Sequence, residues 1–170
     1  MAHKYLNDIG IKSDATCVFN TTEIEKDENG NETSRMQRFR EEREEYGFDD
    51  RETWSLDWTM IGWMYSHLAM YLEIGGKMVD LKYHKFDIPV LEEIPGDEWV
   101  YENSGYPEAY QREVIRENVT QEECIKIAMN YMKTYLEAEF SHNFELEFKA
   151  AECVRCALKI IAEIFPALWW

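Results

Sequence analysis

DDRETWSLDWTMIGWMYSHLAMYLEIGG, residues 49–76, is the longest periodic apolar segment of the chain. Asp49 and Asp50 supply candidate N-cap side chains, Glu52 completes a capping box with Asp49, and Gly75-Gly76 provides a helix stop. Two stripes recur at helical spacing: Trp54, Trp58, Ile61, Tyr65, Leu68 and Leu72 form the first, and Leu56, Met60, Trp63, His67, Met70 and Ile74 form the second. Two apolar stripes predict a helix buried on much of its circumference. We expect it to be the central helix of the fold.

Three other segments carry helix signals. Residues 34–46 alternate charges with Met36 and Phe39, which predicts a short and highly charged helix. Thr120 with Glu123 forms a second capping box. The helix after it has an inward face of Ile125, Ala128, Met132, Tyr135 and Leu136, and the last helix, which ends at Pro166, has one of Leu146, Ala150, Val154, Ala157, Ile161 and Ile164. The sequence therefore predicts a mainly α fold, compact around the central aromatic helix, with residues 1–170 as a single domain.

Two regions lack helical periodicity. Residues 20–33 are polar and contain Asn-Gly, which predicts a loop. Residues 77–118 are punctuated by proline and glycine around short runs such as 78–81 and 98–101, and we expect an irregular acidic and aromatic region, or a small hairpin, there. A loop region of this length in a compact domain tends to be functional.

The composition restricts the class of partner. The chain has 170 residues, 34 Asp and Glu against 18 Lys and Arg, a formal charge of −16, and 45% hydrophobic residues. An acidic surface repels phosphate, so we expect neither direct nucleic-acid binding nor binding to an anionic membrane. The sequence offers neither a signal peptide nor an apolar run of about 18 residues, and its four cysteines are few, so we expect a location in the bacterial cytoplasm.

The acidic residues are concentrated in one region. Between Asp87 and Glu123 we count eleven acids against two basic residues, a local charge of −9. Aromatic residues interleave with these acids and are favoured anchors at interfaces. The residues expected to bind a partner are Asp87, Glu92, Glu93, Asp97, Glu98, Trp99, Tyr101, Glu102 and Tyr106. Such a surface complements the cationic groove of a protein that binds nucleic acid. The alternative interpretation is that the acids only confer solubility.

Residues 46–57, YGFDDRETWSLD, resemble the opening of the long aromatic helix in a family of small proteins from phages and prophages of Gram-positive gut bacteria. The similarity extends to residues 81–86, LKYHKF, and to the tryptophan-bearing end. It covers about two thirds of the chain in outline and implies a phage origin. Small acidic phage proteins often block host enzymes or defence systems, so the resemblance implies an inhibitor, such as an anti-CRISPR protein, that carries no catalysis and no cofactor.

Other residues suggest chemistry, each with a structural alternative. Asp57 is expected to face an apolar side of the central helix, as a site residue or as a hydrogen-bonded structural acid. Cys153 and Cys156 have the C-x-x-C spacing of zinc or redox sites, which Cys124 would join. The second half of a zinc motif is missing, so we interpret them as inert core cysteines and expect no metal.

Two further functions remain open. Glu41, Glu42 and Glu45 resemble half of the Mg²⁺ site of an all-helical nucleotide hydrolase, although such a face is more often simply solvated. The apolar end at Trp169-Trp170 is expected to pack on the domain, and in a phage assembly subunit it would mediate self-association. The histidines are dispersed, and His84 is the one we expect to be exposed. The sequence does not fix the oligomeric state.

Overall fold

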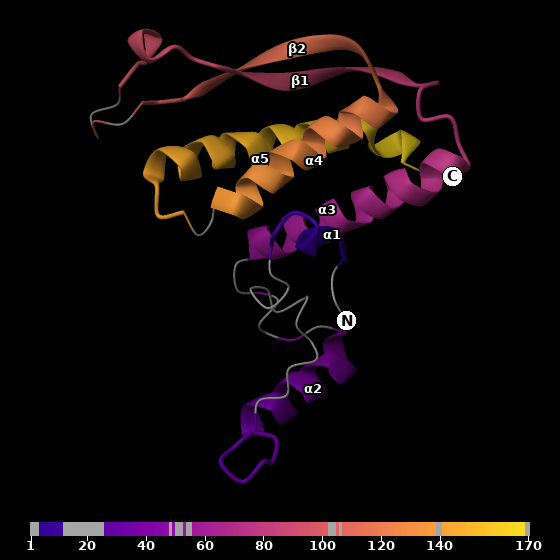
Figure 1. Ribbon diagram of the computed structural model, residues 1–170, viewed down its shortest axis with the longest axis vertical. Coiled ribbons are helices and arrows are strands. Elements are labelled where there is room, and N and C mark those ends of the chain that lie inside the picture. Colours follow the sequence, from indigo (N-terminus) through magenta and orange to yellow (C-terminus); the bar gives the residue numbers. More distant parts are fainter. Residues whose placement is uncertain are drawn as a thin grey trace. The chain divides into compact units, whose positions relative to one another are not determined.

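The computed structural model describes residues 4–11, 26–47, 49, 53, 56–101, 105, 107–138 and 141–168. The chain divides into two compact units, residues 1–63 and residues 64–170, and each is treated by itself. Figure 1 shows the elements of both. The single-domain organisation stays a prediction.

The first unit contains α1 (Lys4–Asn7), α2 (Ser34–Tyr46) and the beginning of α3 (Leu56–Ile74). Helix α2 has the predicted bounds because Thr33 caps it: the Thr33 Oγ1 accepts a hydrogen bond from the Met36 N–H at 3.4 Å. The described part of helix α3 begins at Leu56, and residues 50–52, 54 and 55 lie outside the described residues, so the capping of this helix by Asp49 stays a prediction. Asp49 is fully buried, and its carboxylate pairs with the Arg43 guanidinium at 2.7 Å. Asp50, Glu52 and Trp54 lie outside the described residues.

The second unit contains the rest of α3, then η3 (Gly75–Lys77), β1 (Lys85–Glu93), η4 (Gly96–Glu98), β2 (Gln111–Thr120), α4 (Gln121–Ala138), α5 (Phe144–Ile164) and η5 (Phe165–Ala167). Strands β1 and β2 form an antiparallel hairpin, and Figure 1 shows it lying along the paired helices α4 and α5. The mainly α fold is confirmed, with one small sheet. Among the described helices, none is long and apolar enough to cross a membrane.

Helices α4 and α5 form as the sequence predicts. The Thr120 N–H and the Glu123 carboxylate are 3.1 Å apart, and the Glu123 N–H returns a hydrogen bond to the Thr120 hydroxyl at 3.3 Å, which is a complete capping box. Asn143 caps α5 through the Leu146 N–H. The fully buried side chains of the two helices include Ile125, Ala128, Met132, Leu136, Ala157, Ile160 and Ile164. The predicted inward faces are therefore confirmed in most of their residues, but Leu146, in the first turn of α5, is 40% exposed, so its predicted place on the inward face is wrong.

Backbone groups anchor the outer edge of β1 to both helices. The Leu91 N–H donates to the Tyr131 hydroxyl of α4 at 2.8 Å, and the Cys156 thiol of α5 donates to the Pro89 carbonyl at 3.4 Å. Pro89 has no N–H, which suits an edge position. Asn118 has a φ of 59°, and the register shifts opposite Asp87, where a bulge bends β2.

Helix α3 differs from the prediction. The first stripe is buried at Trp58, Ile61, Tyr65 and Leu68. The second stripe is not buried: its exposed members are Leu56, Met60, Trp63, His67, Met70 and Ile74. Helix α3 is also absent from the packed pairs of described elements, all of which lie among β1, β2, α4, α5 and η5. The prediction of a central helix buried on much of its circumference is therefore wrong, because periodicity shows which residues share a face but not what covers that face.

The region expected to be irregular contains the hairpin, so the small hairpin named as its alternative is confirmed. Its strands lie at 85–93 and 111–120 rather than in the short runs 78–81 and 98–101, which form a turn and the end of η4 with the residues after it. In the polar loop 20–33, the described part is a turn in which the Asp27 carboxylate accepts hydrogen bonds from the N–H groups of Asn29 and Asn31.

Candidate functional site

An aromatic cluster lies at the end of the hairpin where the connection after Glu93 leads to Gln111. The Tyr110 ring is buried and contacts Trp99 edge-on at 5.2 Å and Phe148 of α5 at 6.4 Å, measured between ring centroids. Trp99 also contacts Tyr101 at 6.4 Å, and its indole N–H donates to the Ile94 carbonyl at 2.9 Å. Such ring pairs each contribute about 0.5–1.5 kcal/mol beyond area burial. The cluster therefore holds Trp99 in place and leaves Tyr101 exposed.

Backbone pairing extends the hairpin through this connection. The Ile94 N–H donates to the Tyr110 carbonyl at 2.9 Å, and the Glu108 N–H donates to the Val100 carbonyl at 2.8 Å. Tyr101 and Pro107 form an isolated antiparallel bridge. The described part of the connection is thus an ordered extension that presents Asp97, Glu98 and Glu108 beside the aromatic cluster.

Ion pairs within the chain already engage several predicted acids. Glu92 and Glu98 lie 3.5 and 3.9 Å from the Arg112 guanidinium, and Glu93 lies 3.0 Å from the Lys149 ammonium. Asp97 and Glu108 are exposed, and they have no ion pair with any residue that the structure describes. We call Asp97, Glu98, Trp99, Tyr101 and Glu108 the acidic–aromatic surface.

Lys149 joins the hairpin to α5. Its ammonium lies 3.1 Å from the Glu145 carboxylate and 5.7 Å from the Tyr110 ring centroid. Partial burial acts to lower the pKa of Lys149, but its hydrogen bonds with Glu93 and Glu145 outweigh this effect and raise the pKa. Lys149 therefore remains an ammonium ion and ties the cluster to the helix.

Glu152 is a buried acid that the sequence did not single out. One carboxylate oxygen accepts a hydrogen bond from the Tyr110 N–H at 3.0 Å, and the other is buried without a partner among the described groups. Burial raises the pKa of Glu152, although hydrogen bonds from the N–H groups of Tyr110 and Gln111 oppose the shift. Glu152 supports the base of the aromatic cluster. It was missed because a glutamate beside Cys153 gives no separate sequence signal.

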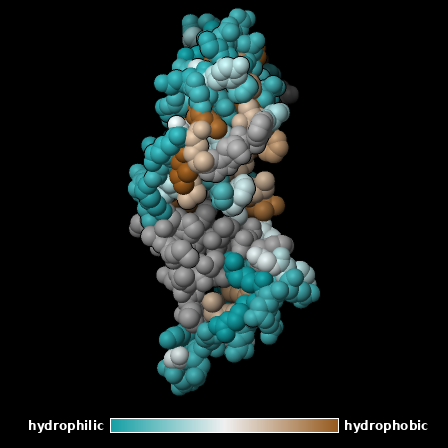
Figure 2. All heavy atoms as spheres, turned by 90° about the vertical axis from the view of Figure 1, so that its right-hand side faces the viewer, coloured by the Kyte–Doolittle hydropathy of each residue, from teal (hydrophilic) through white to brown (hydrophobic). Residues whose placement is uncertain are grey.

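The structure brings together most of the predicted partner-binding residues. Glu92, Glu93, Asp97, Glu98, Trp99 and Tyr101 lie along one end of the hairpin and its extension. Asp87 is separate: it lies at the bulge, where its carboxylate accepts a hydrogen bond from the Asn118 N–H at 3.0 Å. Glu102 and Tyr106 lie outside the described residues. Figure 2 shows that hydrophilic residues cover most of the upper end of the molecule in that view.

The other candidate residues have ordinary structural positions. Asp57 is exposed, so the prediction that it faces an apolar side is wrong. Cys124, Cys153 and Cys156 are buried free thiols, and burial raises the pKa of each to about 11. Such thiols stay protonated near neutral pH and are poor nucleophiles. His84 is exposed, as expected.

The acids of the hydrolase hypothesis lie on α2. Glu41 and Glu45 are exposed, and Glu42 lies 3.2 Å from the Arg38 guanidinium. In the described part of the chain, no three His, Cys, Asp or Glu side chains gather closely enough to hold a metal ion. Cys17 and Trp169-Trp170 are outside that part.

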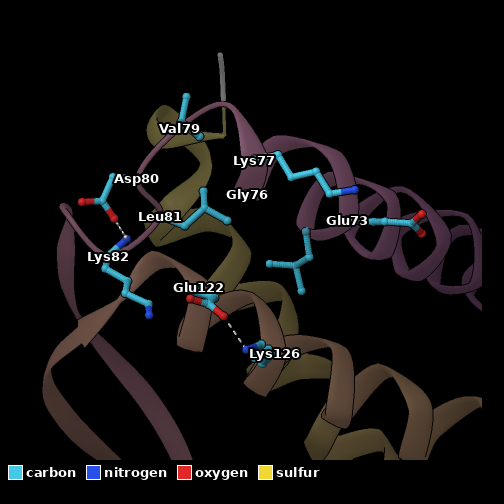
Figure 3. Close-up of a pocket in the computed structure, with 10 residues that line it drawn as sticks. Glu73, Gly76, Lys77, Val79, Asp80, Leu81, Lys82, Glu122 and Lys126 are labelled. Atoms are coloured by element: carbon cyan, nitrogen blue, oxygen red, sulfur yellow. Dashed lines mark hydrogen bonds and ion pairs between the residues drawn. The ribbon is translucent and has the colours of Figure 1, made fainter.

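A pocket of about 620 Å³ lies where the end of α3 and the following turn meet the start of α4. Figure 3 shows its lining, which includes Lys77, Lys82 and Lys126 opposed by Glu73, Asp80 and Glu122. Lys126 forms an ion pair with Glu122, and its hydrogen bond to that carboxylate is the main reason why the pKa of Glu122 is lowered. The three ammonium groups balance the three carboxylates, so the pocket is electrostatically unlike the acidic–aromatic surface.

No protein-family model, curated protein or solved structure matches the chain. The resemblance to phage proteins therefore stays a prediction.

Proposed function

We propose that the chain is a phage-encoded binding protein that inhibits a host nucleic-acid-handling defence protein, such as a CRISPR nuclease. It occupies a basic surface of that protein and does so without catalysis. The observation that carries the proposal is the pairing of a fixed aromatic cluster with exposed acids that lack an ion pair in the described chain, Asp97 and Glu108.

The cluster supplies what an interface needs. Trp99 is held by Tyr110 and by its hydrogen bond to Ile94, so binding costs little side-chain entropy there. Tyr101 and Val100 beside it are exposed by 56% and 62%. Aromatic and apolar groups surrounded by acids fit a groove that carries Lys or Arg around an apolar contact.

The ion pairs determine which acids test the proposal. Neutralising Glu92, Glu93 or Glu98 would release Arg112 or Lys149, so a loss of binding would mix lost charge with a disturbed hairpin. Asp97→Asn with Glu108→Gln removes two charges and breaks no ion pair to a described residue. Glu28→Gln with Glu163→Gln is the matched control, since both residues are exposed acids outside the acidic–aromatic surface.

The experiment is a pull-down from a Gram-positive host lysate at low salt and at about 0.5 M salt, with bound proteins identified by mass spectrometry. The captured protein is then purified and its nucleic-acid cleavage measured with the wild type and both variants. We expect the wild type and the control to inhibit cleavage, and the Asp97/Glu108 variant to inhibit weakly with a flatter salt dependence. Equal inhibition by all three would refute the electrostatic mechanism, and capture of proteins unrelated to nucleic acid would refute the proposed target class.

A further inference from the structure

The two edges of the hairpin differ in how their backbone groups are paired. Leu91 and Pro89 direct their backbone groups away from β2, toward Tyr131 and Cys156. Glu113 lies opposite Leu91, and Ile115 lies opposite Pro89. In an antiparallel pair, two opposed residues either exchange hydrogen bonds or both point away. The N–H and C=O groups of Glu113 and Ile115 therefore point to the outer edge of β2.

That outer edge lacks a hydrogen-bond partner in the described part of the chain. The Ile115 side chain is 63% exposed, and those of Arg112 and Glu113 are 57% and 39% exposed. Both charged side chains also have ion pairs within the chain, Arg112 with Glu92 and Glu98, and Glu113 with Lys159 of α5. In Figure 1, β1 runs between β2 and the helices, so β2 forms the far edge of this unit. An edge strand with free backbone groups is a template for another strand.

A second copy of the chain is a poor occupant, because each of the three central registers that pair the two edges symmetrically opposes like charges. If Glu113 and Ile115 make the new hydrogen bonds, three central registers exist. One places Glu113 opposite Glu113 of the second copy. The next places Arg112 opposite Arg116 twice, and the third places Glu113 opposite Glu117 twice. Like charges directly opposite destabilise strand pairing.

We propose that the outer edge of β2 receives one extended segment of the partner protein as an added antiparallel strand. This inference rests on the proposed function in one respect, that the partner is a protein. It adds how the hairpin binds that protein. The segment carries a basic residue opposite Glu113, acidic residues opposite Arg112 and Arg116, and β-branched residues opposite Val114 and Ile115. In chain order this complement is Glu-Val-Ile-Lys-Glu.

The probe is the blocked peptide acetyl-Thr-Glu-Val-Ile-Lys-Glu-Thr-amide, and its matched control has the charges exchanged, acetyl-Thr-Lys-Val-Ile-Glu-Lys-Thr-amide. Amide exchange of the ¹⁵N-labelled full chain is followed by NMR with each peptide. We expect the first peptide to slow exchange at Glu113 and Ile115 by roughly tenfold, the effect of about one added hydrogen bond. Exchange at Val114, which points toward β1, is expected to stay unchanged. The control peptide is expected to have no effect.

Two variants sharpen the test. Ile115→Pro removes an outward N–H and leaves the ladder to β1 intact, whereas Ile115→Val keeps that N–H; only the proline variant should lose the peptide. If the proline variant does not fold, Arg116→Glu takes its place, because it breaks no ion pair to a described residue, and it should weaken binding of the first peptide.

Three results would overturn the inference: unchanged exchange at Glu113 and Ile115 with the matched peptide, equal effects of both peptides, or a concentration-dependent dimer that the proline variant abolishes. The peptides do not need Asp97 or Glu108. Failure here leaves the proposed function standing, and failure of the Asp97/Glu108 experiment leaves strand addition standing.

Discussion

Tyr131→Phe tests how the hairpin is attached to the helices. The variant removes one hydroxyl group and leaves the Leu91 N–H without its acceptor, which lies at 2.8 Å in a half-buried position. An unsatisfied buried donor costs about 1–3 kcal/mol. Because water reaches part of this edge, we expect a loss of about 1–2 kcal/mol in the free energy of unfolding, which corresponds to a fall in Tm of roughly 2–8 °C in a chain of this length.

The measurement combines urea unfolding with amide exchange of Leu91. The Leu91 amide should exchange faster in the variant, while amides in the middle of α4 should keep their rates. Tyr83→Phe is the control, since Tyr83 is 77% exposed and losing its hydroxyl should change the free energy of unfolding by less than about 0.5 kcal/mol. Equal stability of the two variants, or an unchanged Leu91 rate, would show that the hairpin does not depend on this backbone attachment.

Two other predictions concern titration. Because the pKa of Glu152 is raised, the folded state holds its proton more tightly than the unfolded state, so its contribution to stability falls as pH rises through the raised pKa. Glu123 has a lowered pKa, caused first by its hydrogen bond with Thr120, so its contribution is lost as pH falls through the lowered pKa. Both are tested by measuring the free energy of unfolding in urea at several pH values across the acidic range. Glu152→Gln should weaken its dependence on pH in the upper part of that range, and Glu123→Gln should weaken it in the lower part. The opposite assignment would contradict both pKa directions. Iodoacetamide should modify Cys124, Cys153 and Cys156 slowly in the folded protein and rapidly in urea, since their pKa values are about 11, and fast modification of the native chain would show that a thiol is activated.

Local signals predicted the helices well. The capping box of Thr120 and Glu123 set the start of α4, and the charged pattern from Ser34 to Tyr46 set the bounds of α2. These signals act between residues three or four apart, so they can be read from sequence. The burial of α3 could not be predicted from sequence, because apolar stripes show which residues share a face of the helix but not whether other residues pack against that face.

A small hairpin was expected in this region, but the positions of its strands could not be predicted, for a different reason. Its attachment to the helices joins Leu91 to Tyr131 and Pro89 to Cys156, residues 40 and 67 positions apart, through backbone groups that have no sequence signature. The bulge at Asn118 also breaks the alternation of β2. Composition did identify the acids beside Trp99, but it could not show that Arg112 and Lys149 engage three of them.

Under the two proposals, the hairpin would bind its partner in two ways, through the charges of its acidic side chains and through the backbone groups of β2. If both proposals hold, acids such as Asp97 and Glu108 would act at a distance and speed the approach of a basic partner, an effect that salt screens. Hydrogen bonds at Glu113 and Ile115 would form only after contact and are short-ranged, so they would govern how long the complex lasts. The same charges that oppose pairing between two copies of β2 would set the register of the partner's strand. On these proposals, one set of side chains on β2 would both disfavour pairing with a second copy of the chain and favour a complementary strand of the partner.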